Sequence, residues 1–284
     1  MMTNFPIISA VAVACSELLG TTDGDFIVRQ RQFGMDERIA ALASEIASAD
    51  SVVALTGAGV STASGVPSFR GDGGIWERFD QRDFHFRRFQ ADPAGFWKDR
   101  IDLREAFYGD REIEPNAAHE ALAALERAGH LDAILTQNVD GLHQAAGSES
   151  VVELHGTNRE VKCVDCGHRE PADPIFERAR DGELPPTCPD CSGDLKPAVV
   201  LFGESMPDEP TIRAHELAGR SGVFLAIGSS LTVQPAAGLP SRAQRSGATL
   251  AVINLEETSV SSRADYDHRA DVTEVLPAVV GALE

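Results

Sequence analysis

The sequence predicts an α/β fold built on a doubly wound parallel sheet, in which two insertions interrupt the alternation of strands and helices. Short runs of β-branched and apolar residues alternate with segments of helical periodicity along most of the chain. The first of these runs ends abruptly in Gly57-Ala58-Gly59, a turn expected where a buried strand passes into a helix. Strands that alternate with helices imply a parallel sheet covered on both faces.

The elements of this core follow in order along the chain. A helix is expected at 36–49, where apolar or Ala positions recur at helical spacing, and a buried strand at 51–56. The other helices are expected at 116–128, 208–219 and 235–246, and the other strands at 133–136, 151–154, 198–202, 223–227 and 250–254. The core is therefore assigned to residues 35–71, 116–157 and 197–284.

Two segments break the alternation. Residues 72–115 are rich in aromatic and charged side chains with few strand-like runs, which predicts a helical insertion lying over the glycine turn. Residues 158–196 are rich in Cys, Pro, Asp and Gly and form the second insertion. Residues 1–34 are interpreted as a dispensable N-terminal extension, because their apolar stretch lacks the leading Lys or Arg of a signal peptide.

The charge balance disfavours some classes of partner. The 284 residues carry 44 acidic against 25 basic side chains, a formal net charge of −19, and only Lys98, Lys162 and Lys196 are lysines. Direct binding to nucleic acid or anionic lipid is disfavoured, and no apolar run reaches the ~18 residues that span a bilayer. We expect a cytoplasmic protein from a halophilic archaeon, because acidic groups keep a protein soluble in molar salt. An acidic face for a basic partner is the alternative explanation.

Four of the five cysteines form two Cys-x-x-Cys pairs. Residues 167–187 separate Cys163 and Cys166 from Cys188 and Cys191, which is close to the spacing of four-cysteine zinc ribbons. A redox dithiol or two unrelated pairs is the alternative, but a redox motif does not require the second pair. Four sulfur ligands leave no open position on zinc, so the metal is expected to hold the insertion together and to take no part in chemistry.

Glycine-rich or polar loops follow several strands and indicate a nucleotide site. The turn from Gly57 to Ser61 fits a phosphate cradle, although its third glycine comes late and no acidic residue follows at the distance usual in dinucleotide folds. Taken alone, the turn is explained equally well as a plain connection between strand and helix. Residues 67–71 add a rigid turn, an aromatic ring and a guanidinium, and 137–140 and 228–230 follow later strands. The carboxyl ends of parallel strands share one edge, where ligands bind.

Several long motifs occur in a fixed order. They are Gly57-Ala58-Gly59-Val60-Ser61, Gly65-Val66-Pro67-Ser68-Phe69-Arg70, residues 136–143 (TQNVDGLH), His155-Gly156, the two cysteine pairs, Pro197-x-Val199-Val200-x-Phe202-Gly203-Glu204 and Gly228-Ser229-Ser230-Leu231-x-Val233. In this order they resemble the sirtuin family from about residue 36 to the end of the chain. The resemblance implies a catalytic domain over 35–284, with a Rossmann-type domain, a smaller domain made of the helical and zinc-ribbon insertions, and a cleft between them for NAD and an acyl-lysine peptide.

The resemblance also implies a reaction: NAD-dependent removal of acetyl or related acyl groups from protein lysines, yielding nicotinamide, free lysine and O-acyl-ADP-ribose. His155 would be the general base, a role that suits a histidine that is neutral near pH 7. Asn138 and Asp140 are implied beside it as catalytic residues. The implied NAD contacts are Gly57, Ala58, Gly59, Ser61, Pro67, Phe69, Arg70, Trp76, Gln137, Asn138, Val139, Asp140, Gly228, Ser229, Ser230, Asn254, Leu255 and Ala270.

Substrate contacts are carried over in the same way. The substrate peptide is expected to add as a β-strand to edges supplied by Phe202, Gly203, Glu204 and Val233. Trp97 and Arg100 stand where relatives that prefer succinyl- or malonyl-lysine carry Tyr-x-x-Arg. Because the tyrosine hydroxyl is absent, an uncharged acyl group is favoured, and acidic acyl groups are the alternative. Packing in the core is the other interpretation of Trp97.

Three other functions compete with this reaction. Protein mono-ADP-ribosyl transfer is the alternative within NAD chemistry, because it uses the same cleavage. A zinc-ribbon binding module leaves His155 and residues 137–140 unexplained, and the intact His155, Asn138 and Asp140 disfavour a sensor with a dead site. Acyl-lysine proteins are the expected partners. Basic DNA-associated proteins are expected among them, because an acidic enzyme attracts lysine-rich tails at low salt.

Overall fold

Two sheets organise the chain in the computed structural model, which describes residues 34–68, 74–107 and 113–284. The larger sheet has six strands in the order β3-β2-β1-β7-β8-β9, all paired in parallel. Its strands are β1 (Val52–Thr56), β2 (Ala133–Thr136), β3 (Val151–Glu153), β7 (Val223–Ile227), β8 (Thr249–Ile253) and β9 (Tyr266–His268). Every residue of β1, β2 and β7 is buried, because central strands of a parallel sheet are covered on both faces.

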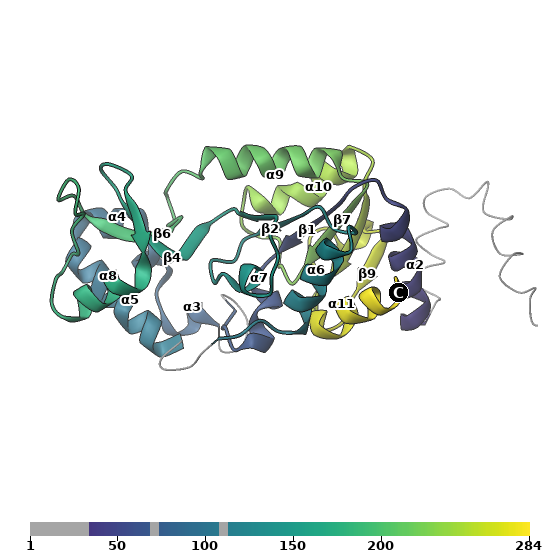
Figure 1. The fold of residues 1–284 in the computed structure, drawn as a ribbon, viewed down its shortest axis with the longest axis horizontal. Coiled ribbons are helices and arrows are strands. Elements are labelled where there is room, and N and C mark those ends of the chain that lie inside the picture. The colour runs from purple at the N-terminus through teal and green to yellow at the C-terminus, as the bar shows by residue number, and fades with distance from the viewer. Residues whose placement is uncertain (1–33, 69–73, 108–112) are drawn as a thin grey trace, which may run out of the picture.

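Helices cover both faces of this sheet (Figure 1). One face packs against α2 (Met35–Ser48), α6 (Ala117–Arg127) and α11 (Val272–Gly281), and the other against α9 (Asp208–Arg220) and α10 (Leu239–Arg245). Because successive side chains of a strand point to opposite faces, β1 contributes to a hydrophobic core on each face of the sheet: Ala54 points into the first, and Val53 and Leu55 point into the second. The short helix α7 (Leu142–Ala145) follows β2 at the carboxyl edge of the sheet.

A smaller lobe lies beside the carboxyl edge of the large sheet (Figure 1). Its antiparallel sheet has the order β5-β4-β6, formed by β4 (Gly156–Cys163), β5 (Arg169–Pro171) and β6 (Leu195–Val199). Its helices are α3 (Ile75–Arg78), α4 (Phe86–Ala91), α5 (Pro93–Phe107) and α8 (Ala172–Arg180). Phe96 and Trp97 of α5 share one hydrophobic core with Val161 of β4 and Ile175 of α8. The two insertions thus build a single lobe.

One strand differs from its prediction. A core strand was expected at 198–202, but β6 runs from Leu195 to Val199 and pairs antiparallel with β4 in the small sheet. The physical reason is local, since the chain turns back from the second cysteine pair and lies directly along β4. The helix expected at 235–246 begins as a 3-10 turn at Ala236–Gly238 before α10.

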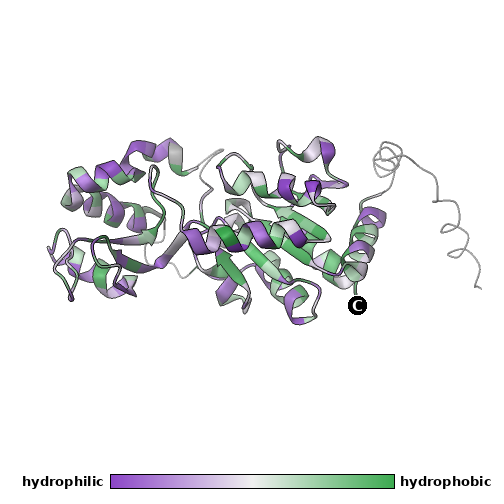
Figure 2. Cartoon of the chain, turned by 90° about the horizontal axis from the view of Figure 1, so that it is seen from above, coloured by the Kyte–Doolittle hydropathy of each residue, from purple (hydrophilic) through white to green (hydrophobic). Residues whose placement is uncertain are grey.

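Apolar residues concentrate in the strands of the large sheet, and hydrophilic residues line the outward sides of the helices (Figure 2). The helices in the described part of the chain include none that is long and apolar enough to cross a membrane.

Candidate functional site

Two glycine-rich loops meet at the carboxyl edge of the large sheet. β1 and β7 are neighbours, but the chain proceeds from β1 to β2 on one side and from β7 to β8 on the other. Gly59, after β1, donates its N–H to the oxygen of Gly228, after β7, at 2.8 Å. A Cβ on Gly59 would lie 2.8 Å from that oxygen, and Gly228 has a φ of 57°, so both positions require glycine. Doubly wound sheets bind nucleotides where the strand order reverses, and this glycine-only cradle fits the phosphates of NAD.

Polar side chains tie the loop after β2 to the first glycine loop. Asn138 Nδ2 donates to Gly57 O and to Ser61 Oγ, both at 3.1 Å. Ser61 Oγ donates in turn to Asp140 Oδ2 at 2.8 Å. Asn138 and Ser61 are buried, where polar groups are normally hydrogen-bonded. The structure therefore brings together in one network these three residues, which the sequence assigned to the site.

His155 follows β3 at the same edge and is half-buried. Its Nδ1 lies 3.1 Å from Gln137 O, and because a carbonyl can only accept, Nδ1 carries the proton and Nε2 keeps its lone pair. Gln137 is itself held by a bond from its Nε2 to Ser229 Oγ at 2.8 Å. Burial lowers the pKa of His155 below 6.5, and the hydrogen bond to Gln137 O opposes this shift. The ring is neutral near pH 7 and oriented, as a general base requires.

A buried chain of hydrogen bonds at the ends of β1 and β2 supports the loop that follows β2. Thr56 and Thr136 end β1 and β2, and Thr56 Oγ1 donates to Thr136 Oγ1 at 2.9 Å. Thr136 Oγ1 also accepts from Asn138 N at 3.1 Å. Because Thr56 has a single hydroxyl proton, His143 Nε2 must donate to Thr56 Oγ1, 2.9 Å away. Burial, with a smaller effect of His119, lowers the pKa of His143 to about 3.

No role was assigned to either threonine from the sequence. A visible signal was present, because each threonine is the one polar residue at the end of an otherwise apolar strand, VVALT and AILT. A hydroxyl there has no water to bond and must find a partner in the neighbouring strand. His119 was also missed; its Nε2 lies 3.4 Å from Ser61 Oγ.

The predicted peptide edge at 202–204 packs against the helical insertion. Phe202 N donates to Phe84 O at 3.1 Å, and Phe202 O accepts from Phe86 N at 2.9 Å. Both main-chain groups of Phe202 are therefore engaged inside the protein, although the residue is 40% exposed. Gly203, with a φ of 79°, lies against the ring of His85. An added peptide strand has to pair with the residues beyond Phe202.

Trp97 and Arg100 lie in the small lobe. Trp97 is 0% exposed, and its Nε1 donates to Leu195 O at 2.8 Å. Arg100 is 9% exposed, with its guanidinium carbon 4.9 Å from the centre of the Phe84 ring. The burial of Trp97 favours its interpretation as a core residue over contact with an acyl group.

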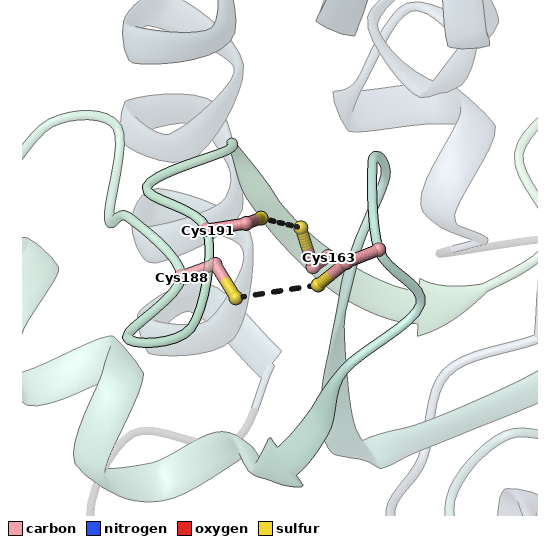
Figure 3. Close-up of side chains that lie close together, drawn as sticks. Cys163, Cys188 and Cys191 are labelled. Atoms are coloured by element: carbon pink, nitrogen blue, oxygen red, sulfur yellow. Dashed lines mark hydrogen bonds between the residues drawn. The ribbon is translucent and has the colours of Figure 1, made fainter.

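The four cysteines of the second insertion converge from two turns (Figure 3). The sulfur atoms of Cys163, Cys166, Cys188 and Cys191 all lie within 4.8 Å of one another. The Cys163–Cys191 and Cys166–Cys188 sulfur pairs are 3.5 and 3.6 Å apart. A tetrahedral zinc ion with bonds of about 2.3 Å separates its sulfurs by roughly 3.8 Å, so this set fits one ion. The ion would join the end of β4 to the segment before β6.

The structure describes only some of the remaining residues that were predicted to contact NAD. Phe69 and Arg70 lie outside the described residues, as does the side chain of Trp76. Asn254 and Leu255 follow β8, and Ala270 follows β9, at the edge where the glycine loops lie. Leu255 is 68% exposed. Ala58, Pro67 and Val139 are half-buried, and Ser230 is exposed.

Comparison with known proteins gives one consistent result. The model of the Sir2 family matches residues 57–235. An NAD-dependent protein deacetylase of Haloarcula marismortui is 62% identical over 248 residues, covering 87% of this chain and 95% of the relative. An NAD-dependent protein deacylase 2 of Archaeoglobus fulgidus is 38% identical over 87% of this chain and 96% of its own length.

Solved structures agree with the sequence relatives. A Sir2 mutant in complex with a deacetylated p53 peptide and 3'-O-acetyl ADP-ribose superposes with a TM-score of 0.79 at 35% identity, over 86% of this chain and 97% of that one. A Sir2 complex with a p53 peptide and NAD+ gives a TM-score of 0.77 at 35% identity, over 85% and 96%.

Proposed function

The chain belongs to the Sir2 family, and from this membership we propose that it removes acetyl groups from protein lysines in an NAD-dependent reaction. The observation that carries the proposal is the state of His155, a neutral ring whose Nδ1 is fixed by Gln137 O at 3.1 Å. This base stands at the sheet edge that also holds the glycine cradle and the Ser61–Asn138–Asp140 network. One structural zinc and NAD as co-substrate complete the enzyme.

His155 acts through its Nε2. NAD, when bound, would supply an electrophilic ribose carbon: its bond to nicotinamide breaks as its bond to the acyl oxygen forms, and water then releases the free lysine and leaves the acyl group on ADP-ribose. Nε2 of His155 takes the proton from a ribose hydroxyl, and the bond from Nδ1 to Gln137 O stabilises the imidazolium that forms. Gln137 thus orients the base through its carbonyl while its amide binds Ser229, which couples the base to the second glycine loop.

Asn138 and Asp140 hold the pocket around the ribose and the nicotinamide. The Asn138 amide donates to Gly57 O and Ser61 Oγ, and Asp140 accepts hydrogen bonds from the Ser61 hydroxyl and from Leu142 N at 3.0 Å. These bonds fix the two loops to each other, so little further ordering is needed when NAD binds. A zinc ion held by the four cysteine sulfurs would have no open position and would hold the small lobe together.

The test is a comparison of three proteins in molar salt: wild type, His155→Ala and the control His130→Ala. His130 precedes β2, at the sheet edge opposite the site. Mass spectrometry should show NAD-dependent loss of acetyl from a lysine peptide, with O-acetyl-ADP-ribose formed, by wild type and the control. His155→Ala should be slower by about 10²- to 10⁴-fold. Intact acetyl peptide together with ADP-ribose on protein would instead identify a mono-ADP-ribosyltransferase.

The preferred acyl group is uncharged. Trp97, in the place where succinyl-selective relatives carry tyrosine, has its N–H bound to Leu195 O and offers no hydroxyl to a carboxylate. The same assay with a succinyl-lysine peptide should give a lower kcat/KM than the acetyl peptide. Faster consumption of the succinyl peptide would contradict this assignment.

Basic DNA-associated proteins in the cytoplasm of a halophilic archaeon are the proposed substrates. The net charge of −19 and the 62% identity to a Haloarcula protein support this setting. Electrostatic attraction between the acidic enzyme and a lysine-rich tail is screened to about 3 Å at 1 M salt. The KM for such a tail should therefore rise with salt at low ionic strength and level off near 1 M, whereas a short neutral peptide should show no rise.

A further inference from the structure

Lys196 is a buried lysine on β6 of the small lobe. Its side chain is 4% exposed, and it lies on β6 next to Leu195, which pairs with the zinc ligand Cys163. Its ammonium nitrogen contacts three oxygens: Val199 O at 2.7 Å, Pro197 O at 3.2 Å and Glu204 Oε2 at 3.2 Å. An ammonium group has three N–H donors, so these acceptors satisfy it completely. Burial lowers the pKa of Lys196, and the charge of Glu204 opposes that shift.

The contact with Glu204 closes a turn. Glu204 Oε2 also accepts from Leu201 N at 2.9 Å, and Glu204 N donates to Leu201 O at 3.0 Å. Gly203 lies inside this turn with a φ of 79°, a conformation that other residues resist. On its other side, the main chain of Phe202 is bonded to the helical insertion at Phe84 and Phe86. The segment 201–204 is thus held from three directions, and Lys196 supplies a charged anchor for it.

We infer that Lys196 is a positioning residue for the substrate peptide, because it fixes the turn from Leu201 to Glu204 against which the peptide strand adds. This inference rests on the proposed function and on the expectation that the acyl-lysine peptide pairs with the main chain beyond Phe202, whose own N–H and C=O are bonded to the helical insertion. A main-chain edge binds a peptide only if its N–H and C=O groups point outward in register, which the turn geometry decides. Without the ammonium, two buried carbonyls lose one donor and the Glu204 carboxylate keeps the Leu201 N–H but loses its cation, so we expect the carboxylate to move toward water.

The same strand connects the zinc to the edge. β6 begins at Leu195, which is in register with Cys163 and accepts the Trp97 N–H, and Lys196 follows directly. The main chain of β6 then leads through Val199 to the turn. An alternative role for Lys196 is stabilisation of the small lobe alone. Loss of that role would lower Tm, whereas loss of the positioning role would raise the KM and Kd for the peptide.

The experiment compares Lys196→Met with Lys196→Arg and with a matched ion-pair control. Met has similar length without donors, whereas Arg keeps a cation that can bond the same oxygens. The control is Arg178→Met, which breaks the pair between Arg178 Nε and Glu183 Oε2 at 2.8 Å in the same lobe. For each protein the KM for an acetyl-lysine peptide, the KM for NAD, kcat and Tm are measured. Calorimetric binding of the peptide gives a readout that needs no turnover.

The expected result for Lys196→Met is a rise of about tenfold in KM and Kd for the peptide, with kcat and the KM for NAD within about twofold of wild type. Lys196→Arg should recover most of the peptide affinity, and Arg178→Met should lower Tm without changing the peptide KM. If Lys196→Met does not fold, Lys196→Gln replaces it in the comparison with wild type, because Gln removes the positive charge but retains two N–H donors. A lowered Tm with an unchanged peptide Kd, or equal rises in both KM values, would overturn the inference. Failure of the proposed function would appear in the wild-type protein instead, as absence of deacetylation.

Discussion

Removing one hydroxyl at the end of β1 should weaken both the fold and the active site. Thr56→Val keeps the shape of the side chain and deletes two hydrogen bonds of 2.9 Å, to Thr136 Oγ1 and to His143 Nε2. His143 Nδ1 already has no hydrogen-bond partner in the described structure, so its ring would lose its remaining bond. A buried polar group left unpaired costs about 1–3 kcal/mol, and we expect a loss of about 2–3 kcal/mol in the free energy of unfolding.

Thr136→Val should cost a similar amount, because it deletes the bond to Thr56 and the bond from Asn138 N. The bond between the two threonines is common to both variants. The double variant should therefore lose less than the sum of the single losses, by on the order of 1 kcal/mol. Asn138 also loses an anchor, so kcat/KM for the acetyl peptide should fall in Thr136→Val.

Urea denaturation followed by far-UV circular dichroism measures these losses. Thr249→Val is the control, because Thr249 lies in β8 of the same sheet and is only half-buried; it should change stability by less than about 0.5 kcal/mol. If the losses at 56 and 136 simply add, the two hydroxyls do not interact and the proposed chain of hydrogen bonds is wrong.

Four further predictions follow from particular contacts. Because the unprotonated ring of His155 is the active form and burial lowers its pKa, kcat/KM should fall with decreasing pH along a limb centred below 6.5; a limb above 6.5 would contradict the assigned environment. The pKa of His143 is lowered to about 3 and that of His268 to about 4, whereas the unfolded chain takes up these protons near 6.5. The stability they contribute is therefore complete above pH 6.5 and is lost as pH falls toward 4, and a flat urea midpoint across that range would refute this. Zinc removal by a chelator should shift the fluorescence of Trp97 while the circular dichroism of the parallel sheet persists, since Cys163 and Trp97 share a core; unchanged fluorescence would exclude that coupling. Gly156→Ala should lower the free energy of unfolding by about 3 kcal/mol or more, because Gly156 has a φ of 74° and an added Cβ would lie 2.1 Å from Ala198 O. Gly129→Ala is the control: Gly129 has a φ of 77° but no atom within 4 Å of an added Cβ, so the loss should be only about 1–2 kcal/mol, and Tm is measured for both variants.

Local chemistry in the sequence was enough to predict the kind of fold and the kind of site. The mainly apolar runs 52–56 and 223–227 form central strands in which every residue is buried, as their composition predicts. The two Cys-x-x-Cys pairs carry their geometry with them, since a knuckle turn places two sulfurs on one metal. Glycine at positions 57, 59 and 228 likewise reflects a close backbone approach that no other residue allows.

Contacts between distant segments were decided only by the tertiary structure. The sequence shows that Thr56 needs a polar partner but not that Thr136 is that partner. It gives no indication that Gln137 O orients His155 or that Lys196 reaches Glu204. The strand expected at 198–202 was assigned to the wrong sheet, because five apolar residues fit a parallel core and an antiparallel sheet equally well, and β6 (Leu195–Val199) pairs antiparallel with β4. A pattern along the chain reports which side chains must be buried. Which partners they meet depends on the packing of elements far apart in sequence, and this protein's base, peptide edge and buried hydroxyls are all held by such partners.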